Sequence, residues 1–117
     1  MTSQTTPYSS WRKAGDTYYI SGQLPLDPAT GEYPASIEDQ TTKALNNLET
    51  TLADFGCTRS DIIKTTVFLR DFADFARFNK VYSNFFAAPY PARSAFQVAG
   101  LAQGANIEIE AIAQKES

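Results

Sequence analysis

The sequence predicts an α+β domain in which two helices cover one face of a mostly antiparallel sheet. Segments of strand-like composition are separated by two segments with helical spacing, in the order β-β-α-β-α-β-β. With 117 residues the chain is long enough for one core and leaves little for a second. We therefore expect a single domain over residues 1–117, with residues 1–6 flexible.

The first elements form a hairpin. A strand is expected over residues 10–13, and residues 17–21 (Thr-Tyr-Tyr-Ile-Ser) are β-branched or aromatic, as is typical of a strand. Residues 14–16 (Ala-Gly-Asp) supply the turn between them. Three prolines and a glycine then make residues 24–35 a loop.

A helix follows, with Ser36 as its N-cap and Gly56 as its stop. Its apolar residues recur at helical spacing: Ile37, Ala44, Leu45, Leu48, Leu52 and Phe55. Residues 62–69 are almost continuously apolar or β-branched, which predicts a buried central strand.

Asp71 can cap the second helix, whose aromatic stripe indicates a core-facing side rather than a base-stacking surface. The stripe comprises Phe72, Phe75, Phe78, Tyr82 and Phe85 or Phe86. Two prolines within residues 87–91 end it. Two strands joined by a glycine-containing loop complete the chain, the first over residues 94–98 and the second beginning at Ile107.

The composition excludes several classes of site. The chain has no histidine, which rules out a Ser-His-Asp triad, a Cys-His dyad and a histidine-ligated metal within one chain. Its single cysteine, Cys57, excludes an intrachain disulfide and a thiolate cluster, and we interpret it as a small, partly buried apolar residue.

The charge and the hydropathy of the chain limit the kinds of molecule that it is expected to bind. Ten basic residues are scattered among thirteen acidic ones, giving a net charge of -3, which argues against nucleic-acid binding. No apolar run approaches the roughly 20 residues of a membrane span. The first residues lack the basic and apolar parts of a signal peptide, so we expect a cytoplasmic protein.

The last two strands carry the best candidate site. Arg93 lies at the start of the first, and Glu108 and Glu110 share one side of the second. On neighbouring strands, they would place a cation and a base within reach of one small ligand. Alternatively, Arg93 is a surface or ion-paired arginine and the two glutamates form a solvated face, an interpretation we keep for Glu110.

Short motifs in this region and upstream carry a resemblance to a known family. Those in the last quarter are Pro91-Ala-Arg-Ser, Val98-Ala-x-Leu and Ile107-Glu-Ile-Glu-Ala. Upstream motifs are Pro7-Tyr-Ser, Ser21-Gly-Gln-Leu-Pro-Leu-Asp-Pro28, Lys64-Thr-Thr-Val-Phe-Leu69, Asp74-Phe75 and Asn79-x-x-Tyr82. In this order they resemble the RidA/YjgF family of enamine/imine deaminases, over about Pro7 to Ala113.

The resemblance implies a chorismate-mutase-like fold and a homotrimer with ligand clefts between subunits. It implies that Arg93 holds the substrate carboxylate, that Glu108 positions the hydrolytic water, and that the cleft is also lined by Tyr8, Ser21, Gly22 and Asn79. The implied reaction converts 2-iminopropanoate and 2-iminobutanoate to 2-keto acids and ammonium. It needs no metal or cofactor, because this hydrolysis already proceeds in water and positioning with one base suffices.

The chain also departs from the family pattern. Ala95 stands where many relatives have Cys, Ser or Thr, Gln97 where Glu is common, and Ala102 where a proline is usual; Trp11 also differs. Ala95 argues against a thiol-dependent activity, and Trp11 and Ala102 are expected to reshape the cleft. The alternative function is a non-catalytic trimer that binds small carboxylates and regulates a partner. A ribonuclease is disfavoured by the charge and the missing histidine.

Overall fold

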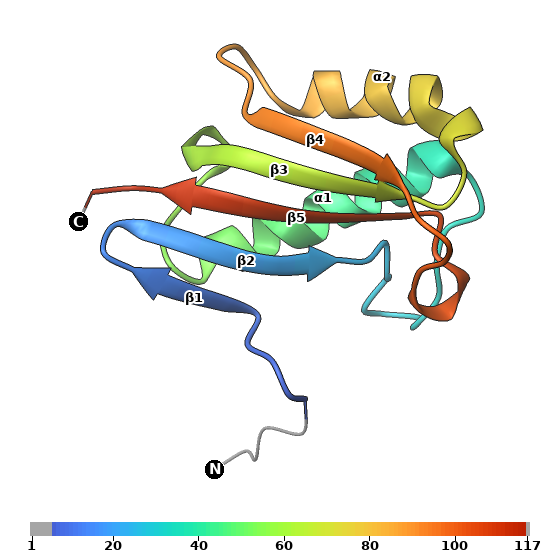
Figure 1. The fold of residues 1–117 in the computed structure, drawn as a ribbon. Helices are drawn as coiled ribbons and strands as arrows, with labels where there is room; N and C mark the ends of the chain where they lie inside the picture. Colours follow the sequence, from blue (N-terminus) through green and yellow to red (C-terminus); the bar gives the residue numbers. More distant parts are fainter. Residues whose placement is uncertain (1–5, 117) are drawn as a thin grey trace.

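A computed structural model describes residues 6–116, so most of the expected flexible segment 1–6 lies outside the described residues. One five-stranded sheet and two α-helices confirm the predicted class and element order (Figure 1). The elements are β1 (Trp11–Ala14), β2 (Thr17–Gln23), α1 (Ile37–Ala53), β3 (Ile62–Leu69), α2 (Phe75–Phe85), β4 (Ala92–Gln97) and β5 (Ile107–Gln114). Three short 3-10 turns are η1 (Arg59–Asp61), η2 (Phe72–Asp74) and η3 (Ala102–Gly104).

The strand order is β1-β2-β5-β3-β4, which corrects one expectation. The last two strands are not neighbours: β5 pairs antiparallel with both β2 and β3, while β4 pairs parallel with β3 at the sheet edge. The reason is the connection, because β3 reaches β4 through helix α2 and such a crossover returns the chain in the same direction. The chain then passes back to the middle of the sheet to add β5 (Figure 1).

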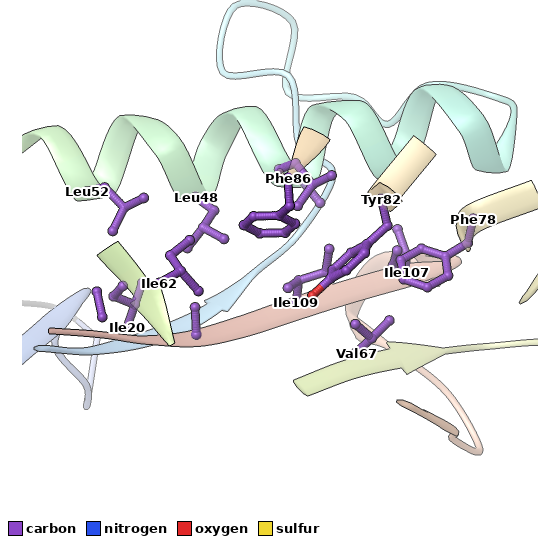
Figure 2. Packing of buried hydrophobic residues seen from close by; sticks show 14 of the residues in the cluster. Ile20, Leu48, Leu52, Ile62, Val67, Phe78, Tyr82, Phe86, Ile107 and Ile109 are labelled. Carbon is purple, nitrogen blue, oxygen red and sulfur yellow. The ribbon is translucent and has the colours of Figure 1, made fainter. Parts of the chain in front are cut away.

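Both helices pack on the same face of the sheet and enclose the core (Figures 1 and 2). The α1 side chains of Leu45, Leu48 and Leu52 are fully buried, and α2 contributes Phe78 and Tyr82. Full burial of each such side chain stabilises the fold by about 1.5–3 kcal/mol. The sheet presents alternate residues of β3 and β5 to this core, as the period-2 pattern requires.

The expected N-cap is present at α1 and absent at α2. Ser36 Oγ accepts a hydrogen bond from Asp39 N at 3.0 Å, as expected of the α1 N-cap. Asp71, expected to cap the second helix, instead caps η2 by accepting from Ala73 N, and α2 begins at Phe75. Cys57 is buried, as expected of a small apolar residue, and burial raises the pKa of its thiol. Among the described residues, no helix is long and apolar enough to cross a membrane.

Strand β2 extends two residues beyond its expected end. Its register against β5 shifts between Ile20 and Gln23, so that Ser21 and Gly22 form a bulge opposite β5. A bulge unpairs the backbone locally and redirects the side chains near it. This irregularity places Gly22 beside Glu108.

Candidate functional site

Arg93 lies in β4 and points toward the helices. Its Nη1 donates to Asn79 Oδ1 of α2 at 2.6 Å. The guanidinium carbon lies 4.8 Å from the ring centre of Tyr82, with Phe75 and Phe78 at 5.5 and 5.6 Å. Cation–π attraction to these rings and the Asn79 bond fix the guanidinium in one position.

A cavity of about 400 Å³ adjoins this guanidinium, and we call it the Arg93 pocket. Its lining residues are Asn79, Tyr82, Ser83, Tyr90, Pro91 and Arg93. A guanidinium carries five N–H donors, so the bond to Asn79 leaves donors for a ligand. A carboxylate can accept two parallel N–H bonds from such a group.

Glu108 is half-buried in β5, beside the bulge of β2. A Cβ built on Gly22 would overlap Glu108 Oε2 and would lie 2.8 Å from its Cδ. Only glycine therefore leaves room for the carboxylate at this position. Glu110, two residues on, is exposed on the same side of the strand, which agrees with the solvated position expected for it.

Burial, and secondarily the negative charge of Glu110, raise the pKa of Glu108 above its usual value. A carboxyl group with a raised pKa is a stronger base when it is ionised. Within one chain, Arg93 is not among the causes of this shift.

Ser21, the first residue of the bulge, contacts the segment before β1, which contains Tyr8. Ser21 Oγ donates to the Ser9 carbonyl at 2.6 Å, which holds the segment before β1 against β2. A second cavity of about 390 Å³ is lined by Tyr8, Ser21 and Gly22. The rest of its lining comes from Asn47 and Thr50 of α1 and from the loop that follows β2. We call it the Tyr8 cavity.

The structure thus forms two groups rather than one site. Arg93 pairs in register with Thr65, whose hydroxyl bonds Tyr82 beneath α2. Glu108 pairs with Phe68, which lies on the alternate face of β3, away from the helices. Arg93 and Glu108 are therefore on opposite faces of the sheet with β3 between their strands, and the expectation that one chain brings them together is wrong.

One neighbour of Glu108 had no signal in the sequence. Tyr33 lies in the loop after β2, and burial together with the charge of Glu108 raises the pKa of its hydroxyl. The loop has no periodicity that could single it out, and 75 residues separate it from Glu108 in the chain. Among residues 6–116, no group of three or more Cys, Asp and Glu side chains is placed to hold a metal ion.

The comparisons with known proteins agree with this fold. A family model described as endoribonuclease L-PSP matches residues 2–115. A RutC family protein of Pyrococcus horikoshii is 47% identical over 111 residues, which cover 94% of this chain and 88% of the relative. The 2-iminobutanoate/2-iminopropanoate deaminase of Mus musculus is 44% identical over 108 residues, covering 92% of this chain and 80% of that protein.

The crystal structure of E. coli TdcF with bound serine is similar in both sequence and structure. It is 42% identical, superposes with a TM-score of 0.91, and the match covers 97% of this chain and 91% of that one. With a family model that matches nearly the whole length, these relatives show that the chain belongs to the endoribonuclease L-PSP family, which is the YjgF/RidA family.

Proposed function

We propose that the protein is a hydrolytic deaminase of small 2-imino and enamine acids, 2-iminopropanoate and 2-iminobutanoate, which releases 2-keto acids and ammonium. Relatives at 44% identity carry the name of this activity. The observation that carries the proposal is the Arg93–Asn79 pair, which holds a guanidinium ready for a carboxylate beside an open cavity. Small imino acids offer that carboxylate next to an electrophilic carbon.

We further propose that the site forms between copies of the chain in a homotrimer. Arg93 and Glu108 lie on opposite sheet faces, so a ligand held by one cannot meet the other in the same chain. A ring of three copies can set the Arg93 pocket of one against the Glu108 side of the next, because head-to-tail contacts close when the rotation permits. Tyr8, Ser21 and Gly22 would then line the same cleft.

The chemistry needs positioning and one base. Glu108 accepts a proton from a water molecule while the water oxygen bonds to the carbon of the protonated imine, and the C=N electron pair moves to nitrogen. This gives a neutral carbinolamine, and the proton held by Glu108 passes to its nitrogen. The C–N bond then breaks with its electron pair on nitrogen, and the hydroxyl proton passes to the departing ammonia, which leaves the 2-keto acid and ammonium. A positioned general base contributes roughly 10²–10⁴-fold to such a step.

A regulatory binder of small carboxylates is the second candidate. It is favoured by one observation, that Arg93, Asn79 and their pocket are complete without Glu108. Such a protein would bind keto acids as tightly as the proposed deaminase would, but it would not accelerate imine hydrolysis. An RNA-cleaving role receives no support from the net charge of -3 or from a chain without histidine.

Glu108→Gln separates the two candidates. The amide keeps the size of the side chain and removes the base, so pyruvate and 2-oxobutanoate should still bind. Hydrolysis of imines generated in situ by a threonine dehydratase should fall at least about tenfold, the low end for a lost general base. Glu110→Gln is the matched control: it removes a charge that is only the secondary cause of the raised pKa of Glu108, so at neutral pH it should hydrolyse imines at close to the wild-type rate. If Glu108→Gln also kept the wild-type rate, the role of Glu108 as base would be wrong.

A further inference from the structure

A buried hydrogen bond joins α2 to the sheet beside Arg93. The hydroxyl oxygens of Thr65 in β3 and Tyr82 in α2 lie 2.7 Å apart. Both residues are buried, with exposed fractions of 0% and 4%. The Tyr82 hydroxyl points from the helix toward the sheet (Figure 2). Because a buried hydroxyl without a partner destabilises the fold, each of these two groups depends on the other.

This bond lies next to the one that holds Arg93. Thr65 and Arg93 are partners in the register of β3 and β4, so their side chains leave the sheet side by side on the face that the helices cover. Tyr82 follows Asn79 by three residues in α2, which places the two on the same side of the helix. The two hydrogen bonds therefore tie one turn of α2 to one register position of the sheet.

The ring of Tyr82 is the contact between this bond and the guanidinium. The Arg93 Cζ atom lies 4.8 Å from the centre of that ring, nearer than it lies to the rings of Phe75 and Phe78. Burial raises the pKa of the Tyr82 hydroxyl, although the bond to Thr65 and the charge of Arg93 act in the opposite direction. The guanidinium thus lies against a neutral phenol whose hydroxyl end is held by Thr65.

The Arg93 pocket offers the Tyr82 ring a second position. Tyr82 lines this cavity as well as bonding Thr65. A hydroxyl that loses its buried partner regains hydrogen bonds by turning toward water in such a cavity. That turn would draw the ring away from the guanidinium and displace the helix turn that carries Asn79.

We propose that Thr65 is a positioning residue for Arg93: its hydroxyl keeps the Tyr82 hydroxyl turned into the core and thereby keeps the ring against the guanidinium. The inference rests on the proposed function, in which Arg93 holds the substrate carboxylate. Thr65 is fully buried, so it acts through Tyr82 and does not touch the ligand. The strand over residues 62–69 thus supports the ligand site as well as the core.

The first test is the affinity for 2-oxobutanoate, measured by calorimetry on the full chain. Thr65→Val keeps the shape of the side chain without the hydroxyl and should weaken binding about three- to tenfold, whereas Thr65→Ser should bind like the wild type. Thr41→Val is the matched control, because Thr41 is equally buried and its hydroxyl donates to the Ile37 carbonyl of α1 at the same distance of 2.7 Å. A loss of folded protein alone would lower the number of binding sites and not their affinity. If Thr65→Val bound as tightly as the wild type, the proposal would be wrong.

A second substitution separates the hydrogen bond from a general loss of packing. In Tyr82→Phe the ring has no hydroxyl to satisfy and stays packed between Phe78 and Phe86, at ring-centre distances of 5.4 and 4.9 Å. Thr65→Val should therefore cause no further loss of affinity when it is added to Tyr82→Phe. Additive losses would assign Thr65 to packing alone and overturn the inference.

The motion of the guanidinium without ligand gives the last readout. Side-chain ¹⁵N NMR, with Arg93→Lys to assign the signals, measures how fast the Arg93 guanidinium rotates about its Cζ–Nε bond. Rotation should be faster in Thr65→Val than in the wild type and unchanged in Thr41→Val, and equal rates in all three would contradict the proposal. Thr65→Cys, whose S–H is only a weak donor, replaces the valine variant if that variant does not fold. If the wild type binds no keto acid, the proposed function fails, and this measurement still decides the role of Thr65.

Discussion

The Arg93 guanidinium is held in place before any ligand arrives. Asn79 accepts one N–H bond and the ring of Tyr82 lies 4.8 Å away, so the side chain has little freedom left to lose on binding. A group fixed in its binding geometry avoids the entropy cost of ordering, which strengthens the complex without adding contacts. The aromatic stripe of α2 therefore serves both the core and the candidate site.

Replacing Arg93 by lysine tests this arrangement. An ammonium group cannot form two parallel bonds to a carboxylate, and the hydrogen bonds to a charged group contribute about 1.5–3 kcal/mol. Binding of 2-oxobutanoate, measured by calorimetry, should weaken roughly ten- to hundredfold. Arg77→Lys is the control, because Arg77 pairs with Glu38 on the exposed surface of the helices. If the Arg93→Lys and Arg77→Lys variants bound 2-oxobutanoate with equal affinity, Arg93 would not be part of the ligand site.

Gly22 leaves room for the Glu108 carboxylate because it has no side chain. In Gly22→Ala the new Cβ would overlap Glu108 Oε2, and the flexible carboxylate can move aside at little cost to stability. We expect imine hydrolysis to fall at least about tenfold, as for a lost base, with a thermal midpoint close to that of the wild type.

Gly100→Ala is the control for Gly22→Ala, since a Cβ on Gly100 meets no atom within 4 Å. Wild-type hydrolysis by the Gly22→Ala variant would show that the observed position of the Glu108 carboxylate is not the one that catalysis needs.

At the scale of elements, one ion pair joins the two helices. Arg77 of α2 donates two hydrogen bonds to Glu38 of α1, at 2.8 and 2.9 Å, and these bonds lower the pKa of Glu38 from 4.5 to about 2. A lowered folded-state pKa means that the stabilisation is present above pH 4.5 and is lost as the pH falls toward 2. Because both side chains are substantially exposed, the contribution is small.

Glu38→Gln should therefore lower the thermal midpoint slightly at neutral pH and much less near pH 2. Thermal unfolding of the wild type and the variant between pH 2 and 7 measures this difference. A midpoint difference that stayed constant down to pH 2 would show that the ion pair is not its source. Glu32→Gln, in the exposed loop before α1, is a suitable comparison for the loss of one surface charge.

The sequence predicted the elements better than their arrangement. The periodicity of residues 37–55 and the apolar run of 62–69 identify a helix and a strand because local spacing records which face is buried. The position of β5 between β2 and β3 depends on contacts across the whole chain, and spacing along one strand does not contain them. The expected Arg93–Glu108 proximity was wrong for that reason.

The same limit applies to the candidate site. The motifs identified Arg93, Asn79, Ser21 and Gly22, and the structure brings Asn79 to Arg93 and Gly22 to Glu108. Tyr33 could not be found, because an isolated tyrosine in an irregular loop has no pattern that relates it to a distant strand. The β2 bulge was equally hidden, since it depends on the register with β5.

At the scale of the molecule, the sheet has one face without helices. Glu108, Glu110 and Lys64 lie on this face, with the exposed aromatic rings of Tyr19 and Phe96. In the proposed trimer this face and the sheet edges meet other copies. Sedimentation should then give about three times 12.9 kDa.

Subunit mixing tests the shared site most directly. Arg93→Ala and Glu108→Gln each leave one half of the site intact, and each variant alone should retain at most about a tenth of the wild-type rate. Equal amounts of the two variants are then unfolded and refolded together. An interface in the resulting trimers is intact if its Arg93 comes from a Glu108→Gln subunit and its Glu108 comes from an Arg93→Ala subunit. Random assembly gives about one intact interface in four, so imine hydrolysis should recover to about a quarter of the wild-type rate. A mixture as inactive as its two components, with mixed trimers verified by mass spectrometry, would contradict a site shared between copies.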